Sequence, residues 1–117
     1  MQKSTIFSII IPFKNWSSDL EECLVHIQKL SFREFEVILL PDKQINLPET
    51  YKDLALSIIP TGSINPALKR DRGARVAKSP YLAFIDDDAY PEGNWLDIAY
   101  KTFSSRSDIG AIGGPAT

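Results

Sequence analysis

Short apolar runs rich in β-branched and aromatic residues recur along the chain, and most of them end abruptly. The first three are each followed by a proline (Pro12, Pro41 or Pro60), which has no N–H to continue a strand ladder. A fourth runs directly into acidic residues, and a fifth precedes a pair of glycines. Together these runs predict five buried strands, at residues 7–11, 36–40, 56–59, 81–85 and 109–112.

After the first and fourth runs, apolar residues recur every three or four positions, which is the spacing of one face of a helix. N-terminal caps of the first two helices are predicted at Ser17, Ser18 or Asp19 and at Asn65. Pro66 supports the second cap because proline suits the first helical position, and this helix is expected to extend to about Lys78. A third helix is expected from Trp95 to Phe103.

Strands and helices alternate, and the strands are apolar on both faces. This pattern is typical of a mostly parallel sheet covered by helices on both sides, so we expect an α/β fold. With 117 residues, of which 44% are hydrophobic, the chain is long enough to form one domain with a core. Ligands of such sheets bind beyond the carboxyl ends of the strands, where candidate site residues are therefore sought.

The charge balance excludes two broad classes of partner. The chain has 13 Lys and Arg against 15 Asp and Glu, a formal net charge of −2, which favours neither nucleic acid nor an anionic membrane surface. The longest apolar run is far shorter than the roughly 20 residues that cross a bilayer, so no membrane span is expected. The single cysteine, Cys23, cannot form an internal disulfide, and the reducing cytoplasm is the default compartment.

Three consecutive aspartates, Asp86, Asp87 and Asp88, directly follow the fourth predicted strand. Adjacent carboxylates repel one another, and a bound divalent cation relieves this repulsion. Mg²⁺ and Mn²⁺ prefer oxygen ligands and commonly combine one or two carboxylates with water and a substrate phosphate. A solvated acidic turn that caps the following helix is the alternative interpretation.

A basic segment precedes that strand. It holds five of the 13 positively charged side chains, Lys69, Arg70, Arg72, Arg75 and Lys78. On a helix these cations cannot all lie apart, because residues three positions apart share a face. They form either a solvated helix surface or, since the helix leads into the strand that ends at the aspartates, contacts for a metal-bound diphosphate.

Four segments carry a resemblance to a known family. They are residues 8–15, 36–42, 70–73 with Ala77, and 81–88. In order and spacing they resemble the N-terminal half of a family 2 glycosyltransferase, and the resemblance covers about residues 7–114. It implies the Rossmann-like GT-A fold, a nucleotide-diphosphate sugar as donor, a divalent metal cofactor (Mg²⁺ or Mn²⁺), and transfer of the sugar with inversion to an acceptor hydroxyl.

The resemblance also implies roles for individual residues. Those expected to bind the nucleotide sugar are Pro12, Lys14, Asp42, Arg70, Asp86 and Asp87. The first three would line the base and ribose pocket, Arg70 would reach the diphosphate, and Asp86 and Asp87 would contact the ribose and donor or hold the metal's water shell. Asp88 would be the metal ligand, and Gly113 and Gly114 would border the donor sugar and the acceptor.

The resemblance places the catalytic base and most acceptor-binding residues beyond Thr117, so no catalytic residue is expected within the chain. We therefore expect a truncated domain, the donor-binding half, with a carbohydrate or lipid-linked acceptor bound elsewhere. A cytoplasmic location is expected, at the inner face of a membrane through parts of the parent protein outside this chain. Lys14 and Pro41 stand where an aromatic residue and an aspartate are common in the family. The resemblance therefore does not specify the nucleobase or the sugar of the donor.

Two other functions fit the same residues. The first is a non-catalytic nucleotide-binding or regulatory module of the same fold. The second is a phosphotransferase of the haloacid dehalogenase type, whose Asp-x-Asp motif Asp86 and Asp88 match in spacing. That motif normally ends the first strand of its domain, whereas three predicted strands precede it here.

Overall fold

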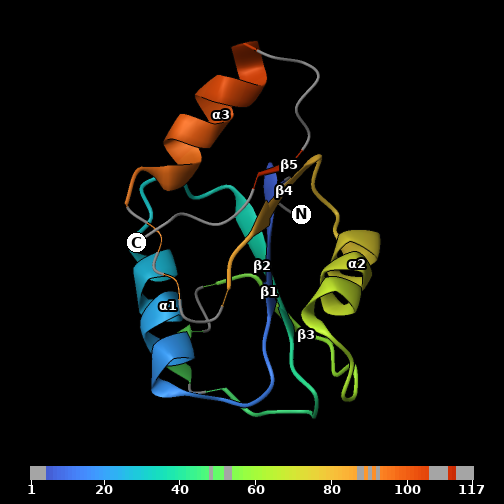
Figure 1. Cartoon of the computed structure of the whole chain (residues 1–117). Helices are drawn as coiled ribbons and strands as arrows, with labels where there is room; N and C mark the ends of the chain where they lie inside the picture. Colours follow the sequence, from blue (N-terminus) through green and yellow to red (C-terminus); the bar gives the residue numbers. More distant parts are fainter. Residues whose placement is uncertain are drawn as a thin grey trace.

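The computed structural model describes residues 5–47, 49–51, 54–86, 89, 91, 93–105 and 111–112. Strands and helices alternate along this part of the chain (Figure 1). In chain order they are β1 (Phe7–Pro12), α1 (Ser18–Gln28), β2 (Phe35–Leu40), the 3₁₀ turn η1 (Glu49–Tyr51), β3 (Leu56–Ile58), α2 (Pro66–Val76), β4 (Tyr81–Phe84), α3 (Trp95–Ser105) and β5 (Ala111–Ile112). Within the described residues, no helix combines the length and apolar composition needed to cross a membrane.

The strands form one sheet in the order β3-β2-β1-β4-β5, and every neighbouring pair is parallel. In the middle of the sheet, Ile9 of β1 lies opposite Val37 of β2 on one side and Ala83 of β4 on the other. From β1 the chain adds β2 and β3 on one side of the sheet and then β4 and β5 on the other. The direction reverses at the boundary between β1 and β4, which is therefore a topological switch point. Sheets of this kind bind ligands beside the carboxyl ends of the strands at such a point.

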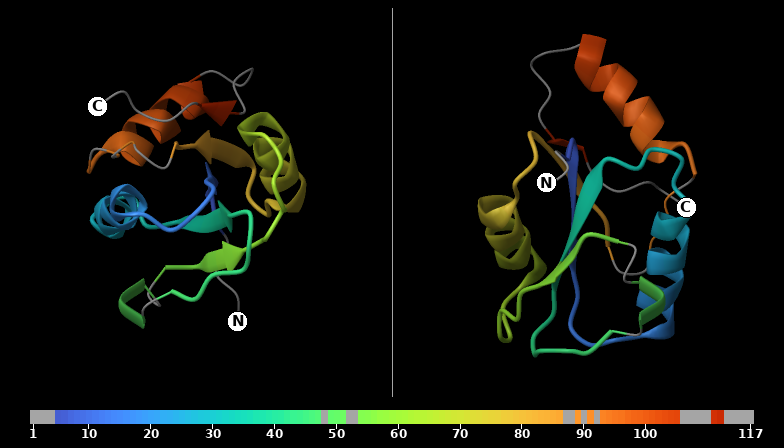
Figure 2. Two further views of the ribbon diagram at one scale, coloured as in Figure 1. Left: turned by 60° about the horizontal axis from the view of Figure 1, so that its bottom comes forward. Right: turned by 180° about the vertical axis from the view of Figure 1, so that it is seen from behind.

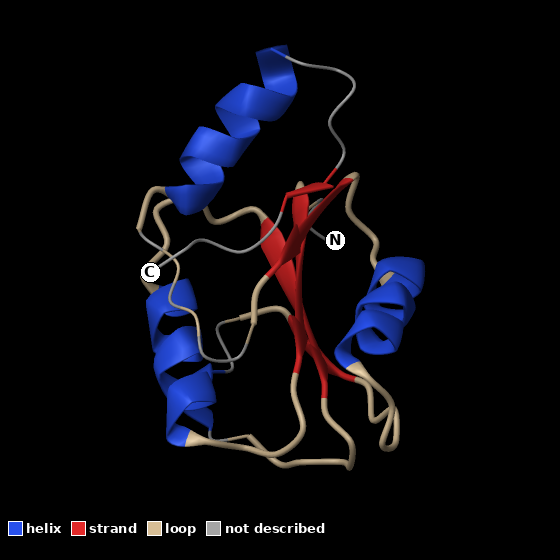
Figure 3. Ribbon diagram, viewed as in Figure 1, coloured by secondary structure: helices blue, strands red, loops and turns tan. Residues whose placement is uncertain are grey.

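Helices cover both faces of the sheet, with α1 and α3 on one side and α2 on the other (Figures 2 and 3). Successive side chains of a strand point to opposite faces, and the core is divided accordingly. Phe7, Ile9 and Ile11 pack into the cluster that contains the buried residues of α1 and α3. Ile10 belongs to a second, smaller cluster on the α2 side. The predicted α/β fold with a helix-covered parallel sheet is thus confirmed.

Both predicted helix caps are present. The Ser17 side chain accepts a hydrogen bond from the Leu20 N–H at 3.2 Å at the start of α1. The Asn65 side chain accepts one from the Leu68 N–H at 2.9 Å at the start of α2, with proline in the first turn. Each cap supplies an acceptor for an N–H that has no partner within the helix.

Several element boundaries differ from the expected ones by one or two residues. β1 includes Pro12, which pairs with Leu40 at the last position of both strands. α2 ends at Val76 instead of about Lys78, because Ala77 has an extended backbone conformation. The predicted fifth strand is observed as Ala111–Ile112, and its first two residues lie outside the described part.

Candidate functional site

A pocket of about 650 Å³ lies beyond the carboxyl ends of β1, β2, β3 and β4, where the chain leaves the sheet at the lower edge of Figure 1. This volume is in the range of small-molecule binding sites. Strand ends contribute Pro12 at the end of β1, Phe13 and Lys14 after it, Asp42 after β2 and Asp86 after β4. The approach to α2 and its first turns contribute Ser63, Ile64, Asn65, Pro66, Lys69 and Arg70.

Five of the predicted nucleotide-sugar-binding residues line this one pocket, although 74 positions separate the first from the last. They are Pro12, Lys14, Asp42, Arg70 and Asp86. They come from the ends of three strands and from one helix, and the parallel arrangement of the strands brings these ends to the same edge of the sheet. The other four predicted site residues, Asp87, Asp88, Gly113 and Gly114, lie outside the described residues.

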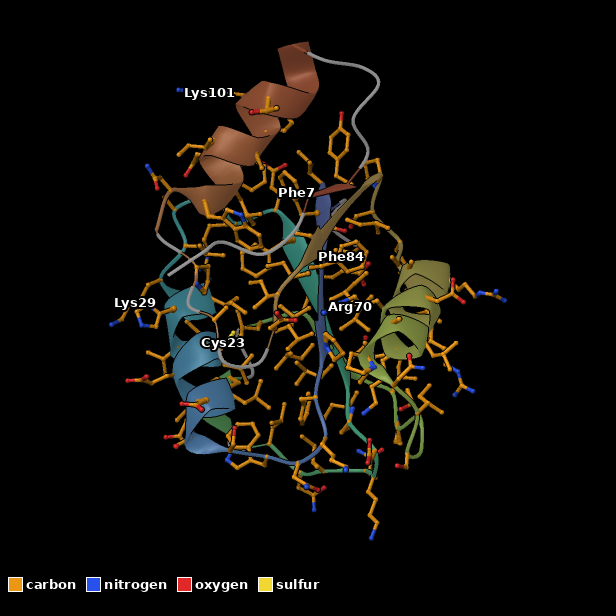
Figure 4. All side chains as sticks on the ribbon, in the orientation of Figure 1. Phe7, Cys23, Lys29, Arg70, Phe84 and Lys101 are labelled. Atoms are coloured by element: carbon orange, nitrogen blue, oxygen red, sulfur yellow. The ribbon has the colours of Figure 1, made fainter. Side chains whose placement is uncertain are left out.

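An exposed ion pair connects α2 with the end of β4. Arg70 Nη2 donates to Asp86 Oδ1 at 2.7 Å, and the two side chains are 38% and 63% exposed. Figure 4 shows Arg70 on the side of α2 that faces the sheet. Ion pairs this open to solvent contribute only about 0–1 kcal/mol to stability. Both side chains can therefore exchange partners for a ligand at small cost.

A buried ion pair lies deeper in the same pocket. Lys69 is 3% exposed, and its Nζ donates to Asp42 Oδ1 and to the Phe13 carbonyl oxygen, each at 2.5 Å. The sequence pattern places Lys69 among the basic residues of its helix, as a solvated side chain or a contact for a diphosphate, and does not predict its burial. The signal is its spacing: Lys69 lies four residues before Gly73, so the two share the side of the helix that packs against the sheet.

Gly73 allows α2 to lie directly against the sheet. A Cβ atom at this position would be 2.6 Å from Ile10 Cγ2, closer than packed carbon atoms approach, and 3.2 Å from Leu40 Cδ1, which is a tight contact. Lys69 and Arg70 lie about one turn earlier on the same helix. The close approach at Gly73 therefore brings both cations within reach of the strand ends.

Backbone hydrogen bonds connect the segments that follow β1, β2 and β3. The Asp42 N–H donates to the Lys14 carbonyl at 3.3 Å, and the Asp42 carbonyl accepts from the Gly62 N–H at 2.9 Å. The Thr61 N–H donates to the Pro41 carbonyl at 2.9 Å. Gly62 has φ = +79°, a left-handed conformation that side chains other than glycine rarely adopt. These bonds hold the three segments next to one another beside the pocket.

The basic segment divides between the pocket and the solvent. Lys69 and Arg70 line the pocket. The other three cations are exposed: Arg72, Arg75 and Lys78. Arg75 Nε pairs with Asp71 Oδ2 at 3.0 Å across one helical turn. The solvated interpretation therefore holds for these three residues, whereas contact of Lys69 or Arg70 with a diphosphate stays a prediction.

Of the three consecutive aspartates, Asp86 belongs to the described part of the chain. Asp86 lines the pocket, and carboxylate oxygens are the donors that Mg²⁺ and Mn²⁺ prefer, so its chemistry fits such an ion. Among the described residues, no three His, Cys, Asp or Glu side chains come together as a metal site. Asp87 and Asp88 are not among these residues.

Comparison with known proteins identifies relatives among glycosyltransferases. The sequence profile described as glycosyl transferase family 2 matches residues 8–116. EpsJ, a glycosyltransferase of Bacillus subtilis, is 28% identical over an alignment of 123 residues, which covers 86% of this chain and 36% of EpsJ. AmsB, the amylovoran biosynthesis glycosyltransferase of Erwinia amylovora, is 28% identical over 95 residues, which cover 74% of this chain and 32% of AmsB.

Solved structures show the same fold. TarS of S. aureus, residues 1–349, superimposes with a TM-score of 0.77 and 26% identity over 88% of this chain and 33% of its own, and so does its complex with UDP. The mannosyltransferase PcManGT of Pyrobaculum calidifontis, solved with GDP-Man and Mn²⁺, has a TM-score of 0.74 at 24% identity, over 87% of this chain and 33% of its own.

The chain spans about a third of the length of each of these proteins. The predicted GT-A fold is confirmed by the superpositions, and the family profile covers nearly all of the sequence in which the four motifs were found. A match of this extent shows that the chain belongs to glycosyl transferase family 2.

Proposed function

We propose that the pocket binds the nucleoside diphosphate of a sugar donor, and that the protein transfers the sugar with inversion to an acceptor hydroxyl. The observation that carries the proposal is the convergence of Pro12, Lys14, Asp42, Arg70 and Asp86 on one pocket at the switch point of the sheet. TarS, which shares the fold at 26% identity, has been solved with UDP, and this supports a nucleoside diphosphate as the ligand.

The proposed roles follow the position of each residue in the pocket. Pro12, Lys14 and Asp42, at the ends of β1 and β2, line the part that takes the base and ribose. Arg70 faces the diphosphate, for which its planar guanidinium offers two parallel donors. Asp86, which follows β4, exchanges its bond to Arg70 for a contact to the ribose or to the metal's water shell.

The proposal includes a divalent metal, Mg²⁺ or Mn²⁺, with Asp88 as its ligand and Asp87 beside the donor. Carboxylate oxygens suit either ion. When bound, the metal supplies positive charge that stabilises the diphosphate leaving group. Arg70 adds a preorganised positive charge on the same group, where negative charge develops as the sugar–phosphate bond breaks.

We place the acceptor side of the reaction mainly outside these 117 residues. The chain spans about a third of its relatives' length, which leaves room in a full-length protein for the group that deprotonates the acceptor and for most acceptor contacts. Gly113 and Gly114 are proposed to border the sugar and the acceptor. The acceptor is proposed to be a carbohydrate or a lipid-linked carbohydrate, because AmsB is named for the biosynthesis of a polymer, amylovoran.

Membership in the family argues against the phosphotransferase interpretation of Asp86 and Asp88. The interpretation as a non-catalytic nucleotide-binding module differs from the proposal only in sugar transfer. A transfer assay on the full-length protein, with a panel of nucleotide sugars and Mn²⁺, separates the two. Transfer supports the proposal, whereas binding of a donor without transfer to any acceptor tested supports the module.

Calorimetric titration of the same panel tests the donor site itself. We expect binding of at least one nucleotide sugar in the presence of Mn²⁺ and loss of that binding in Asp88→Ala. The matched control is Asp71→Ala, which removes an exposed carboxylate that pairs with Arg75 and does not line the pocket. Equal binding by wild type and Asp88→Ala would contradict the proposed metal site.

A further inference from the structure

Lys69 is a buried cation in the wall of the proposed nucleotide pocket. Lysine is seldom buried unless it is paired, because removal of its charge from water is costly. Here 3% of the side chain is exposed, and the ammonium makes two short contacts, to a carboxylate and to a carbonyl. The Lys69 ammonium is therefore paired with groups of the protein itself.

These two contacts join three separate elements. Lys69 is in α2, the Phe13 carbonyl follows β1, and the Asp42 carboxylate follows β2. All three residues line the same pocket. The ammonium thus ties the helix to two strand ends at the place where the ligand is proposed to bind.

Asp42 is constrained on its main chain as well as on its side chain. Its N–H and carbonyl bond to the segments after β1 and β3, and its Oδ1 bonds to Lys69. The carboxylate is 15% exposed, so it cannot turn toward solvent without leaving the buried ammonium unpaired. Asp42 is consequently held in one orientation before any ligand enters.

We infer that Lys69 is a positioning residue for the nucleotide: by binding Asp42 and the Phe13 carbonyl, it holds the base and ribose part of the pocket in its binding shape. The inference rests on the proposed function of the pocket. A site whose contacts are already in place loses less conformational freedom when it binds, which lowers the dissociation constant. Lys69 also neutralises the Asp42 carboxylate, which otherwise repels the diphosphate.

A purely stabilising role of the Lys69–Asp42 pair predicts a different result from a positioning role. If Lys69 only stabilised the fold, its removal would lower the melting temperature, but the protein that remained folded would bind nucleotide with an unchanged dissociation constant. Binding measured well below the melting temperature therefore separates the two roles. Rescue by arginine, which keeps the charge and the donors, tests the same point.

The test measures UDP binding by calorimetry in the presence of Mn²⁺ on the full-length protein. We expect the dissociation constant of Lys69→Met to rise about tenfold or more, the size of one lost charge-assisted contact, and that of Lys69→Arg to stay within about threefold of wild type. The matched control, Lys78→Met, removes an exposed lysine just beyond the same helix and is expected to bind as wild type does.

A second comparison tests whether Lys69 acts through Asp42. Once Asp42→Asn has removed the carboxylate, adding Lys69→Met should raise the dissociation constant clearly less than it does in the wild-type background, because only the contact to the Phe13 carbonyl is then left to lose and residues that act as a unit are not additive. If Lys69→Met alone fails to fold, the double variant Asp42→Asn/Lys69→Met, which leaves neither buried charge unpaired, is compared directly with wild type: weaker UDP binding is expected, and wild-type affinity would overturn the inference.

The outcomes separate the inference from the function on which it rests. If the wild type binds UDP and folded Lys69→Met binds it with the same dissociation constant, the inference is overturned but the proposed function is not. A loss in the Asp42→Asn background as large as in wild type would overturn it too, because Lys69 would then act independently of Asp42. Absence of nucleotide binding to the wild type overturns the proposed function and the inference with it.

Discussion

Two consecutive cations on α2, Lys69 and Arg70, have opposite environments and therefore different energetics. The Lys69 pair with Asp42 is buried on the lysine side, and loss of one partner of such a pair typically costs about 3–5 kcal/mol, because the other charge is left uncompensated. The Arg70 pair with Asp86 is open to solvent and contributes about 0–1 kcal/mol. The buried pair maintains the shape of the pocket, and the exposed pair is available to a ligand.

Replacement of Arg70 by methionine is expected to impair binding without impairing stability. The change removes the donors proposed for the diphosphate, so UDP affinity should fall about tenfold or more, the loss expected for a charged hydrogen-bonding group. The melting temperature should stay close to that of wild type, since the pair with Asp86 is exposed.

Calorimetry and a thermal melt of Arg70→Met check both parts of this prediction. Arg75→Met is the matched control, because Arg75 lies on the same helix but pairs with Asp71, away from the pocket. If both variants bound UDP equally well, Arg70 would have no role in the site.

For individual residues, the sequence predicts the site residues that lie at strand ends. It does not predict the burial of Lys69, which depends on packing. Pro12, Lys14, Asp42 and Asp86 follow apolar runs, so their location at one edge of the sheet follows from the strand pattern. Lys69 lies in a basic helical segment, where a solvated lysine is the usual case. Its burial depends on how closely α2 approaches the sheet, which the charge pattern does not reveal.

That approach is a property of α2 as an element, and it depends on Gly73. Ile10 Cγ2, the atom that a new Cβ would meet at 2.6 Å, is attached directly to a β-branched carbon in the centre of the sheet. It cannot move aside as the tip of a long side chain can. Any side chain at residue 73 must therefore push the helix away from β1 and β2.

The variant Gly73→Ala is expected to lose both stability and affinity. Overpacking costs about 1–3 kcal/mol, while the better helix propensity of alanine returns up to about 1 kcal/mol. The net effect should be a lower free energy of unfolding, measured by denaturant titration. UDP binding should weaken as well, because Lys69 and Arg70 move with the helix.

Gly93→Ala is the matched control for this substitution. A Cβ at Gly93 would come no closer than 4.0 Å to the Lys29 carbonyl oxygen, an ordinary contact. We expect it to retain wild-type stability and affinity. Gly73→Ala with stability equal to that of Gly93→Ala would contradict the packing argument.

The sequence predicts the types of the elements and the helix caps more accurately than the residues at which the elements end. The cap residues Ser17 and Asn65 have side chains that compete for backbone N–H groups, and both cap their helices as predicted. The sequence predicts that α2 extends to about Lys78, two residues beyond its observed end. Ala77 turns to an extended conformation there, and Lys78 already donates its N–H to the buried carboxylate of Glu36 at 2.7 Å. A contact so distant in sequence leaves no local signal.

At the scale of the whole molecule, the strand order creates the site. Alternating elements predicted a parallel sheet with helices on both faces, and this is observed. The pattern of single elements does not specify which strands are neighbours. The observed order, with β1 next to both β2 and β4, is what brings Asp42 and Asp86 to opposite sides of the segment after β1.

Ligand linkage offers a test of the metal in the intact protein. A ligand that binds only the folded state stabilises it by about 2.7 kcal/mol at a concentration one hundred times its dissociation constant. We expect UDP and Mn²⁺ together to raise the melting temperature, and EDTA to abolish the increase due to UDP. Equal shifts by UDP with Mn²⁺ and with EDTA would show that nucleotide binding needs no divalent metal.

The most direct test of the central claim is a crystal structure of the full-length protein with UDP and Mn²⁺. We predict the nucleotide in the pocket beyond the carboxyl ends of β1, β2 and β4, with the base and ribose beside Asp42 and the diphosphate beside Arg70. The Lys69–Asp42 pair should remain intact. A nucleotide bound elsewhere on the protein, with this pocket filled only by solvent, would contradict the account.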